Sequence, residues 1–249
     1  MGKRISHSGI YLLPNLFTTS SLFAAYYSII ASFKHHFITA VMAIFVGMIA
    51  DGLDGRIARL TNTQTAFGAE YDSLADMVTF GVAPSLMVYL WNLQFQGKMG
   101  WLIAFIYTAA VALRLARFNT QIEIADKRYF QGLACPAAAA FVVSWVWICH
   151  EYHIKNQLIS YITMIFCFIS SLLMVSNIRY QSFKQIDLRG KISFLSVLMI
   201  VTVYVAIASN PATVLFLIFT GYAASGPIQT LYVRHKVRKL RRRFSKMKN

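Results

Sequence analysis

Long apolar stretches, separated by short polar segments, recur along the whole of this 249-residue chain. A bilayer has a hydrocarbon layer about 30 Å thick, and a helix needs roughly 20 apolar residues to cross it. Eight stretches approach that length, at residues 15–33, 37–58, 69–93, 100–118, 133–150, 157–176, 191–208 and 211–231. Hydrophobic residues make up 57% of the chain, whereas soluble domains contain about 45–50%. The sequence therefore predicts an all-α integral membrane protein with about eight transmembrane helices.

Basic residues are unevenly distributed between the segments that join these stretches. Successive joining segments lie on alternate sides of the membrane. Of the 24 Lys and Arg, the segments on one side hold only Lys34, Lys98 and Lys155. Because segments rich in Lys and Arg stay in the cytoplasm, we expect both termini there, in a prokaryotic inner membrane. We divide the chain into a transmembrane domain, residues 1–232, and a basic cytoplasmic tail, residues 233–249.

The formal net charge of +15 could suggest a protein that binds nucleic acid. The basic residues lie between apolar stretches, however, so we expect an anionic membrane surface or substrate as the partner, and no nucleic acid. The cysteines, Cys135, Cys149 and Cys167, lie in or beside apolar stretches without CxxC spacing. They are interpreted as packing residues that form neither a disulfide framework nor a zinc site.

Acidic residues are scarce and gather in one place, because five of the nine Asp and Glu fall between residues 51 and 76. Asp51 and Asp54 are three residues apart, so they share one face of a helix. Asp72 and Asp76 are four residues apart and share another. A short polar turn, Thr61 to Thr65, joins the two helices, which must therefore run antiparallel. Four carboxylates are expected to converge near the membrane boundary.

Neighbouring carboxylates need protons or cations to offset their charge. Mg²⁺ or Mn²⁺ prefers carboxylate oxygen, and two such ions suit a phosphoryl or phosphatidyl transfer. Gly55, Ala58 and Gly68 leave room for a ligand, and Arg59 can offer a fork of donors to phosphate. The alternatives are salt bridges from Arg56 and Arg59, a divalent-metal transporter, or a scaffold that recruits partners through the basic tail.

The stretch from Asp51 to Asp76 matches the pattern D-x2-D-G-x2-A-R-x8-G-x3-D-x3-D at every fixed position. This pattern resembles the signature of the CDP-alcohol phosphotransferases, a family of membrane-embedded homodimers. The resemblance implies that Asp51, Asp54 and Asp72 hold two divalent metals. It implies that Asp76 helps to hold one of them and is the general base for the acceptor hydroxyl. The residues implied for the CDP-lipid site are Asp54, Gly55, Ala58, Arg59 and Gly68.

Other segments resemble the membrane-spanning phosphatidylserine synthases of that family. They are LPNLFT in the first span, RLARFN at 114–119, FQGLACPAAAA at 130–140 and MVSNIRYQSFK at 174–184. The resemblance implies transfer of the phosphatidyl group of CDP-diacylglycerol to the serine hydroxyl, with release of CMP. Glycerol 3-phosphate or inositol phosphate as the acceptor, and an archaeal ether lipid as the donor, remain alternatives. Cys135 departs from the small polar residue expected before Pro136.

Further polar residues are expected in the same cytoplasmic layer. Asn15 and Thr18 are expected to open the first helix, where they would bind the CDP-lipid or simply cap the helix. Arg114 and Arg117 lie three residues apart and can bind a carboxylate or a phosphate, with snorkelling as the alternative. The other candidates for the acceptor or phosphate site are Asn119, Gln131, Gly132 and Lys184.

Overall fold

The structure is a computed structural model, and it describes residues 8–61, 63, 65–121, 129–154, 156–181 and 194–247. These residues are almost entirely helical, with one short pair of strands. The first part comprises α1 (Ser8–Phe33), α2 (Phe37–Leu60), α3 (Ala66–Asp76), the π-helix η1 (Met77–Val82), α4 (Ala83–Trp91), the 3₁₀ helix η2 (Leu93–Gln96) and α5 (Gly97–Gln121). The second part comprises β1 (Tyr129–Gln131), α6 (Cys135–Glu151), α7 (Gln157–Val175), β2 (Arg179–Gln181), α8 (Phe194–Ser209) and α9 (Pro211–Met247).

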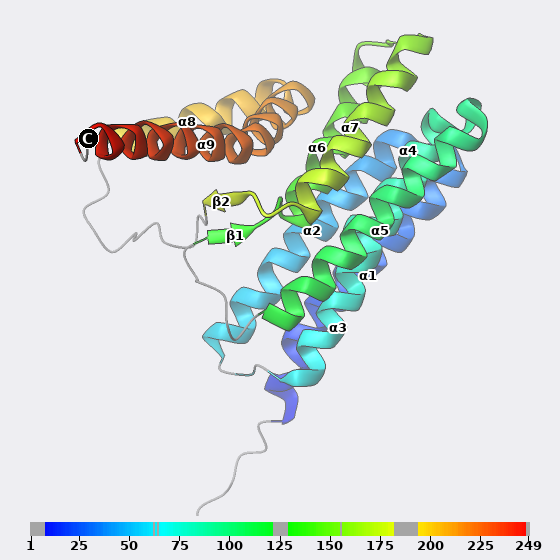
Figure 1. Ribbon diagram of the computed structural model, residues 1–249. Helices are drawn as coiled ribbons and strands as arrows, with labels where there is room; N and C mark the ends of the chain where they lie inside the picture. Colours follow the sequence, from blue (N-terminus) through cyan, green and yellow to red (C-terminus); the bar gives the residue numbers. More distant parts are fainter. Residues whose placement is uncertain are drawn as a thin grey trace, which may run out of the picture.

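Figure 1 shows α1 to α7 lying side by side as a bundle, while α8 and α9 pair with each other and lie across one side of it. Helix α6 is central, because it packs against α2, α4, α7 and α9. Most of its residues are buried, including the four consecutive alanines Ala137–Ala140. Small side chains let neighbouring helices approach closely, which explains why the alanine-rich stretch lies in the centre.

Within the described residues, six helical segments are long and apolar enough to cross a membrane. They are Pro14–Phe33, Phe37–Leu60, Ala66–Trp91, Leu93–Thr120, Gln157–Val175 and Pro211–Tyr232. The stretches expected at 133–150 and 191–208 form the shorter apolar helices Cys135–Glu151 and Val197–Ser209. The helical, membrane-type architecture is thus confirmed, whereas the count of eight spans and the orientation stay predictions.

The third span is not a uniform α-helix, because η1 interrupts it directly after Asp76. The N–H of Ala83 bonds to the carbonyl of Val78, five residues earlier instead of the usual four. Pro84 has no N–H, and its ring would crowd the carbonyl of Phe80 in a regular α-helix. The proline therefore gives a physical reason for the wider turn.

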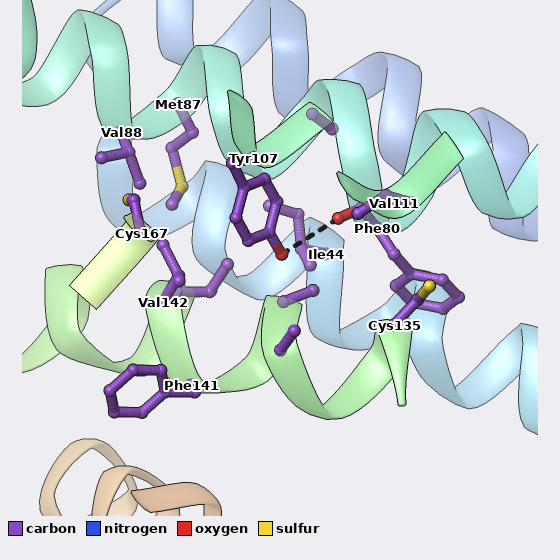
Figure 2. Close-up of a cluster of buried hydrophobic side chains, with 14 of the residues drawn as sticks. Ile44, Phe80, Met87, Val88, Tyr107, Val111, Cys135, Phe141, Val142 and Cys167 are labelled. Atoms are coloured by element: carbon purple, nitrogen blue, oxygen red, sulfur yellow. Dashed lines mark hydrogen bonds between the residues drawn. The ribbon is translucent and has the colours of Figure 1, made fainter. Parts of the chain in front are cut away.

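Figure 2 shows the apolar core around Tyr107, where side chains from α2, α4, α5 and α6 meet. Tyr107 is 1% exposed, and its hydroxyl donates a hydrogen bond to the carbonyl of Phe80, 3.2 Å away. Ile44, Met87 and Val111 are fully buried in the same cluster. The π-helix is therefore packed between other helices of the bundle.

Strands β1 and β2 pair antiparallel, with Phe130 opposite Tyr180. The hydroxyl of Tyr180 donates to the carbonyl of Ala223 in α9, 2.9 Å away, and burial raises the pKa of this tyrosine. Gly226 of α9 lies directly against the Tyr180 ring. The strand pair thus holds α9 against the bundle. Helix α9 continues to Met247, past the domain boundary expected between residues 232 and 233.

Candidate active site

Four aspartates, two on α2 and two on α3, come together in the structure. Carboxylate oxygens of Asp51, Asp72 and Asp76 lie within 4.8 Å of one another. The side chains of Asp51 and Asp76 are in hydrogen-bonding contact, and so are those of Asp54 and Asp72. Ionised carboxylates carry only acceptors, so these contacts need a shared proton or a cation. The convergence expected from the spacing is confirmed.

The donor set of this cluster fits a hard divalent cation. Every donor is a carboxylate oxygen, which Mg²⁺ and Mn²⁺ prefer over nitrogen and sulfur. Oδ1 of Asp72 is buried and has no hydrogen-bond partner among the residues that the structure describes. Because an unsatisfied buried oxygen is costly, this atom is well placed to accept a ligand that the protein does not itself supply.

Asp54 differs from the other three aspartates because it is buried, at 5% exposed. Thr18 of α1 donates a hydrogen bond to Oδ2 of Asp54 over 2.7 Å. Arg59 also lies within electrostatic range of this carboxylate. Thr18 therefore orients a candidate metal ligand, which is a role that the sequence did not reveal.

Replacing Thr18 with valine is expected to raise the Mn²⁺ concentration needed to half-saturate the carboxylate cluster about tenfold to a hundredfold. Groups that orient metal ligands typically contribute that much to affinity or activity, and valine keeps the shape while it removes the hydroxyl. The measurement is Mn²⁺ binding to the purified chain, followed by electron paramagnetic resonance. Ser20→Ala is the control, because this exposed hydroxyl bonds to the Leu16 carbonyl of its own helix. An unchanged requirement in Thr18→Val would refute the role.

The expectation that Asn15 and Thr18 open the first helix is wrong. Helix α1 begins at Ser8 and includes Pro14, so both residues lie inside it and neither caps it. The apolar residues that precede Pro14 extend the helix toward the N-terminus. A site for phosphate at this helix N-terminus is therefore not supported, although both side chains still lie at the end of α1 that meets α2 and α3.

The expected CDP-lipid residues lie at neighbouring ends of α1, α2 and α3: Asn15, Thr18, Asp54, Gly55, Ala58, Arg59 and Gly68. A Cβ added at Gly68 would lie 3.4 Å from Oδ1 of Asn15, so these two residues face each other. A Cβ added at Gly55 would lie 3.6 Å from Nη1 of Arg59, so the guanidinium lies over the glycine. The N–H of Gly68 donates to Thr65, which caps α3 over 3.0 Å.

Arg114 of α5 lies close to the aspartate cluster through Cys135. Its Nη1 donates to Sγ of Cys135 over 3.3 Å, and Cys135 also lies within electrostatic range of Asp76. Nε of Arg114 is buried, and no described residue forms a hydrogen bond with it. A partly buried guanidinium with an unused N–H suits a carboxylate or a phosphate. Cys135, which replaces the small polar residue expected before Pro136, thus lies between Arg114 and the acidic cluster.

Two other expected acceptor residues on α5 have partners within the protein. Nη1 of Arg117 donates to the carbonyl of Ser176 at the end of α7, 3.3 Å away. The side-chain amide of Asn119 donates to Oγ of Ser73 on α3, 3.0 Å away. Both contacts tie α5 to its neighbours, so a structural role is established for these residues whatever else they bind.

The remaining expected acceptor residues lie at or beyond the strand pair. Gly132 has a φ of +77°, and a Cβ there would collide with the carbonyl oxygen of Met174. Its N–H donates to the carbonyl of Ile178 over 2.8 Å, so the glycine is needed for a close backbone approach. Gln131 is exposed at the end of β1. Lys184 lies outside the described residues.

Sequence reasoning missed several hydroxyl groups that hold the site helices together. The hydroxyls of Tyr71 on α3 and Thr19 on α1 are 2.9 Å apart. Ser73 bonds to Asn119, as described above, and Tyr107 bonds to the backbone of η1. Polar side chains inside or beside an apolar helix need partners, and that rule was the one signal available in the sequence.

Comparison with known proteins agrees with the signature carried by α2 and α3. A model of the family described as CDP-alcohol phosphatidyltransferase matches residues 11–175. A CDP-diacylglycerol–serine O-phosphatidyltransferase from Helicobacter pylori is 38% identical over 228 residues, which are 92% of this chain and 94% of that protein. The protein of the same name from Mycobacterium tuberculosis is 38% identical over 151 residues, which are 57% of this chain and 52% of that protein. Another, from Methanocaldococcus jannaschii, is 36% identical over 140 residues, 56% of this chain and 62% of that protein.

Proposed function

Because this chain belongs to the CDP-alcohol phosphatidyltransferase family, we propose that it is a phosphatidylserine synthase. It transfers the phosphatidyl group of CDP-diacylglycerol to the hydroxyl of serine and releases CMP. The observation that carries this function is the convergence of Asp51, Asp72 and Asp76 within the family signature. The serine acceptor is supported by relatives that bear this activity in their names and by the extent of the identity.

The proposed mechanism assigns the four aspartates distinct tasks. Asp51, Asp54, Asp72 and Asp76 would hold two divalent cations, Mn²⁺ or Mg²⁺, and these would neutralise the charge of the pyrophosphate and of the departing phosphate. Asp76 takes the proton from the serine hydroxyl. The hydroxyl oxygen forms a bond to the lipid-side phosphorus, and the bond from that phosphorus to CMP breaks. The lipid tails stay in the bilayer throughout.

We propose that the CDP end of the donor binds against the residues that gather around Gly55 and Gly68. Neither glycine carries a side chain that would keep the cytidine diphosphate from the backbone. Asn15 faces Gly68, and Arg59 lies over Gly55, where its fork of donors can reach a phosphate. The position of Asp54 next to Arg59 supports a site in which one residue serves both the nucleotide and the metals.

We propose that the serine acceptor binds on the side of the aspartates where Arg114 lies. The unused Nε–H of Arg114 is proposed to bind the serine carboxylate. Arg117, Asn119, Gln131, Gly132 and Lys184 are proposed to complete the surroundings of the acceptor or of the lipid phosphate. Arg117 and Asn119 form hydrogen bonds within the protein, so we propose that they hold α5 in place beside the acceptor.

The proposed setting is the cytoplasmic face of a prokaryotic inner membrane. The excess of Lys and Arg on the side that holds the aspartates supports this orientation. Residues 1–232 are proposed as the catalytic membrane domain and residues 233–249 as a basic tail at the anionic lipid surface. A homodimer is proposed from the family alone.

The experiment that tests this function measures CMP release by the purified full chain with CDP-diacylglycerol and either Mn²⁺ or Mg²⁺. Serine, glycerol 3-phosphate and inositol phosphate are supplied as separate acceptors. We expect release with serine alone, complete loss with a chelator, and recovery when the cation is returned. Release with a phosphorylated acceptor instead would contradict the substrate, and release that survives chelation would contradict the metal assignment.

A further inference from the structure

A buried hydroxyl meets the backbone about one turn beyond Asp76. Tyr107 lies in the middle of α5, and its hydroxyl donates to the carbonyl of Phe80 over 3.2 Å. Figure 2 shows this bond crossing the apolar core from α5 to η1. Among the neighbours labelled there, Met87, Val111 and Val142 are apolar and fully buried. A polar contact in such surroundings is both strong and costly to lose.

The carbonyl of Phe80 needs this donor because of the residue four positions later. In an α-helix it would accept from the N–H of residue 84, which is a proline and has none. The ring of Pro84 would also crowd this carbonyl in regular α-helical geometry. The bond from Ala83 to Val78 shows that the backbone is widened here. Tyr107 therefore donates to a carbonyl that Pro84 leaves without its α-helical donor.

The widened turn decides how the two halves of the span face their neighbours. One extra residue rotates a helix by about 100° relative to its continuation. On one side of η1, Asp72 and Asp76 approach Asp51 of α2. On the other side, Met87 and Val88 are fully buried in the apolar core. The π-helix thus lets a single span direct its carboxylates to one place and its apolar side chains to another.

Helix α5 contacts this span on both sides of Asp76. Asn119 bonds to Ser73, three residues before Asp76, and Tyr107 bonds to Phe80, four residues after it. One turn from Tyr107, Val111 lies against Gly81 of η1, where an added Cβ would be 3.3 Å from Cγ1 of the valine. The position of Asp76 is thus fixed between two contacts from one straight helix.

We propose that Tyr107 is a positioning residue for Asp76, and that it acts by holding η1 in its widened form. It touches neither substrate nor cation, and it sets the direction from which Asp76 enters the carboxylate cluster. This inference rests on the function proposed above, in which Asp76 binds a cation and accepts the serine proton. Loss of the Tyr107 hydroxyl leaves the CDP-lipid residues on α1 and α2 in place.

The first test compares Tyr107→Phe with the wild-type full chain. Mn²⁺ binding is measured without substrate by electron paramagnetic resonance, and kcat and KM are measured with CDP-diacylglycerol and serine. We expect Mn²⁺ affinity and kcat each to fall about tenfold, because small displacements of reacting groups cost at least that much. The KM for CDP-diacylglycerol is expected to change less than about twofold.

Tyr180→Phe is the matched control, since it removes the same kind of bond, a buried phenol to a backbone carbonyl 2.9 Å away, from a place outside the cluster. We expect it to lower thermal stability and to leave Mn²⁺ binding unchanged. If Tyr180→Phe weakened Mn²⁺ binding as much as Tyr107→Phe, the effect would be general loosening and the proposal would fail.

Pro84→Ala gives an independent second variant. Alanine returns a backbone N–H to the carbonyl of Phe80 and lets the turn close to α-helical geometry. We expect weaker Mn²⁺ binding and lower kcat without loss of thermal stability. Wild-type Mn²⁺ binding in folded Tyr107→Phe protein, or in Pro84→Ala if the former does not fold, would overturn the proposal. A wild-type chain that binds Mn²⁺ but releases no CMP with serine would instead contradict the proposed function.

Discussion

Replacing Asp76 with asparagine is expected to lower the rate of CMP release about a thousandfold. Asparagine keeps the size of the side chain but cannot take a proton from the serine hydroxyl, and a positioned general base contributes about 10²–10⁴ in rate. The amide is also a weaker ligand than a carboxylate for a hard divalent cation. The measurement is CMP release with CDP-diacylglycerol and serine at saturating Mn²⁺, from variant protein that elutes as the wild type does.

Glu70→Gln provides a matched control for this variant. Glu70 lies on α3 with Asp72 and Asp76, and it is exposed and outside the group of carboxylates that approach one another. It loses the same charge by the same chemical change, so we expect its rate to stay within about twofold of wild type. A variant Asp76→Asn that retains a tenth or more of the wild-type rate would exclude Asp76 as the general base.

Replacing Gly132 with valine is expected to lower the midpoint of thermal unfolding by about 10 °C. The φ of +77° is unfavourable for a β-branched residue, and the new Cβ would collide with the Met174 carbonyl. Together these effects cost about 3 kcal/mol or more, and each kcal/mol shifts the midpoint of a protein of this size by about 2–4 °C. The measurement is thermal unfolding in detergent, followed by loss of monodisperse protein.

Gly221→Val is the matched control, because it makes the same substitution at a glycine with neither a positive φ nor a close neighbour. An added Cβ at Gly221 meets nothing within 4 Å, and its φ is not in the positive range. Because this glycine lies on an exposed part of α9, we expect its midpoint to stay close to wild type. Equal midpoints for the two valine variants would show that the backbone at Gly132 adapts, and that the close approach to Met174 is not needed.

The sequence could predict the features of this fold that depend on local pattern. Apolar stretches became helices at all eight expected places, and the i, i+3 and i, i+4 spacing of the aspartates brought their carboxylates together. The turn from Thr61 to Thr65 was predicted because polar residues there separate two apolar helices. These features follow from helical periodicity and bilayer thickness, which need no knowledge of tertiary contacts.

Contacts between residues far apart in the chain could not be predicted in this way. The bond from Thr18 to Asp54 spans 36 positions, and no local pattern distinguishes Thr18 from the threonine beside it. The strands that pair Phe130 with Tyr180 have three residues each, too few for an alternating pattern to be recognised. The start of α1 was misplaced because Pro14 lies inside the helix, which also includes the apolar residues before it.

The irregular turn in the third span could be predicted from the sequence only in part. A proline inside an apolar helix indicates an irregular turn, and Pro84 was visible in the sequence. What Pro84 could not indicate was the form of the irregularity or its partner, since Tyr107 lies 27 positions from Phe80. Both depend on how α5 packs against η1, and that packing is a property of the assembled bundle.

Cys135, Cys149 and Cys167 are all buried, so the native chain is expected to react little with thiol reagents. A water-soluble maleimide reacts with exposed thiols, so the three native thiols, enclosed by neighbouring helices, are shielded from it. A new cysteine at an exposed position therefore becomes the principal site of labelling. Cysteines introduced in turn at Thr61 and His153, both exposed and both outside the apolar helices, would report which end of the bundle faces the outside of an intact cell.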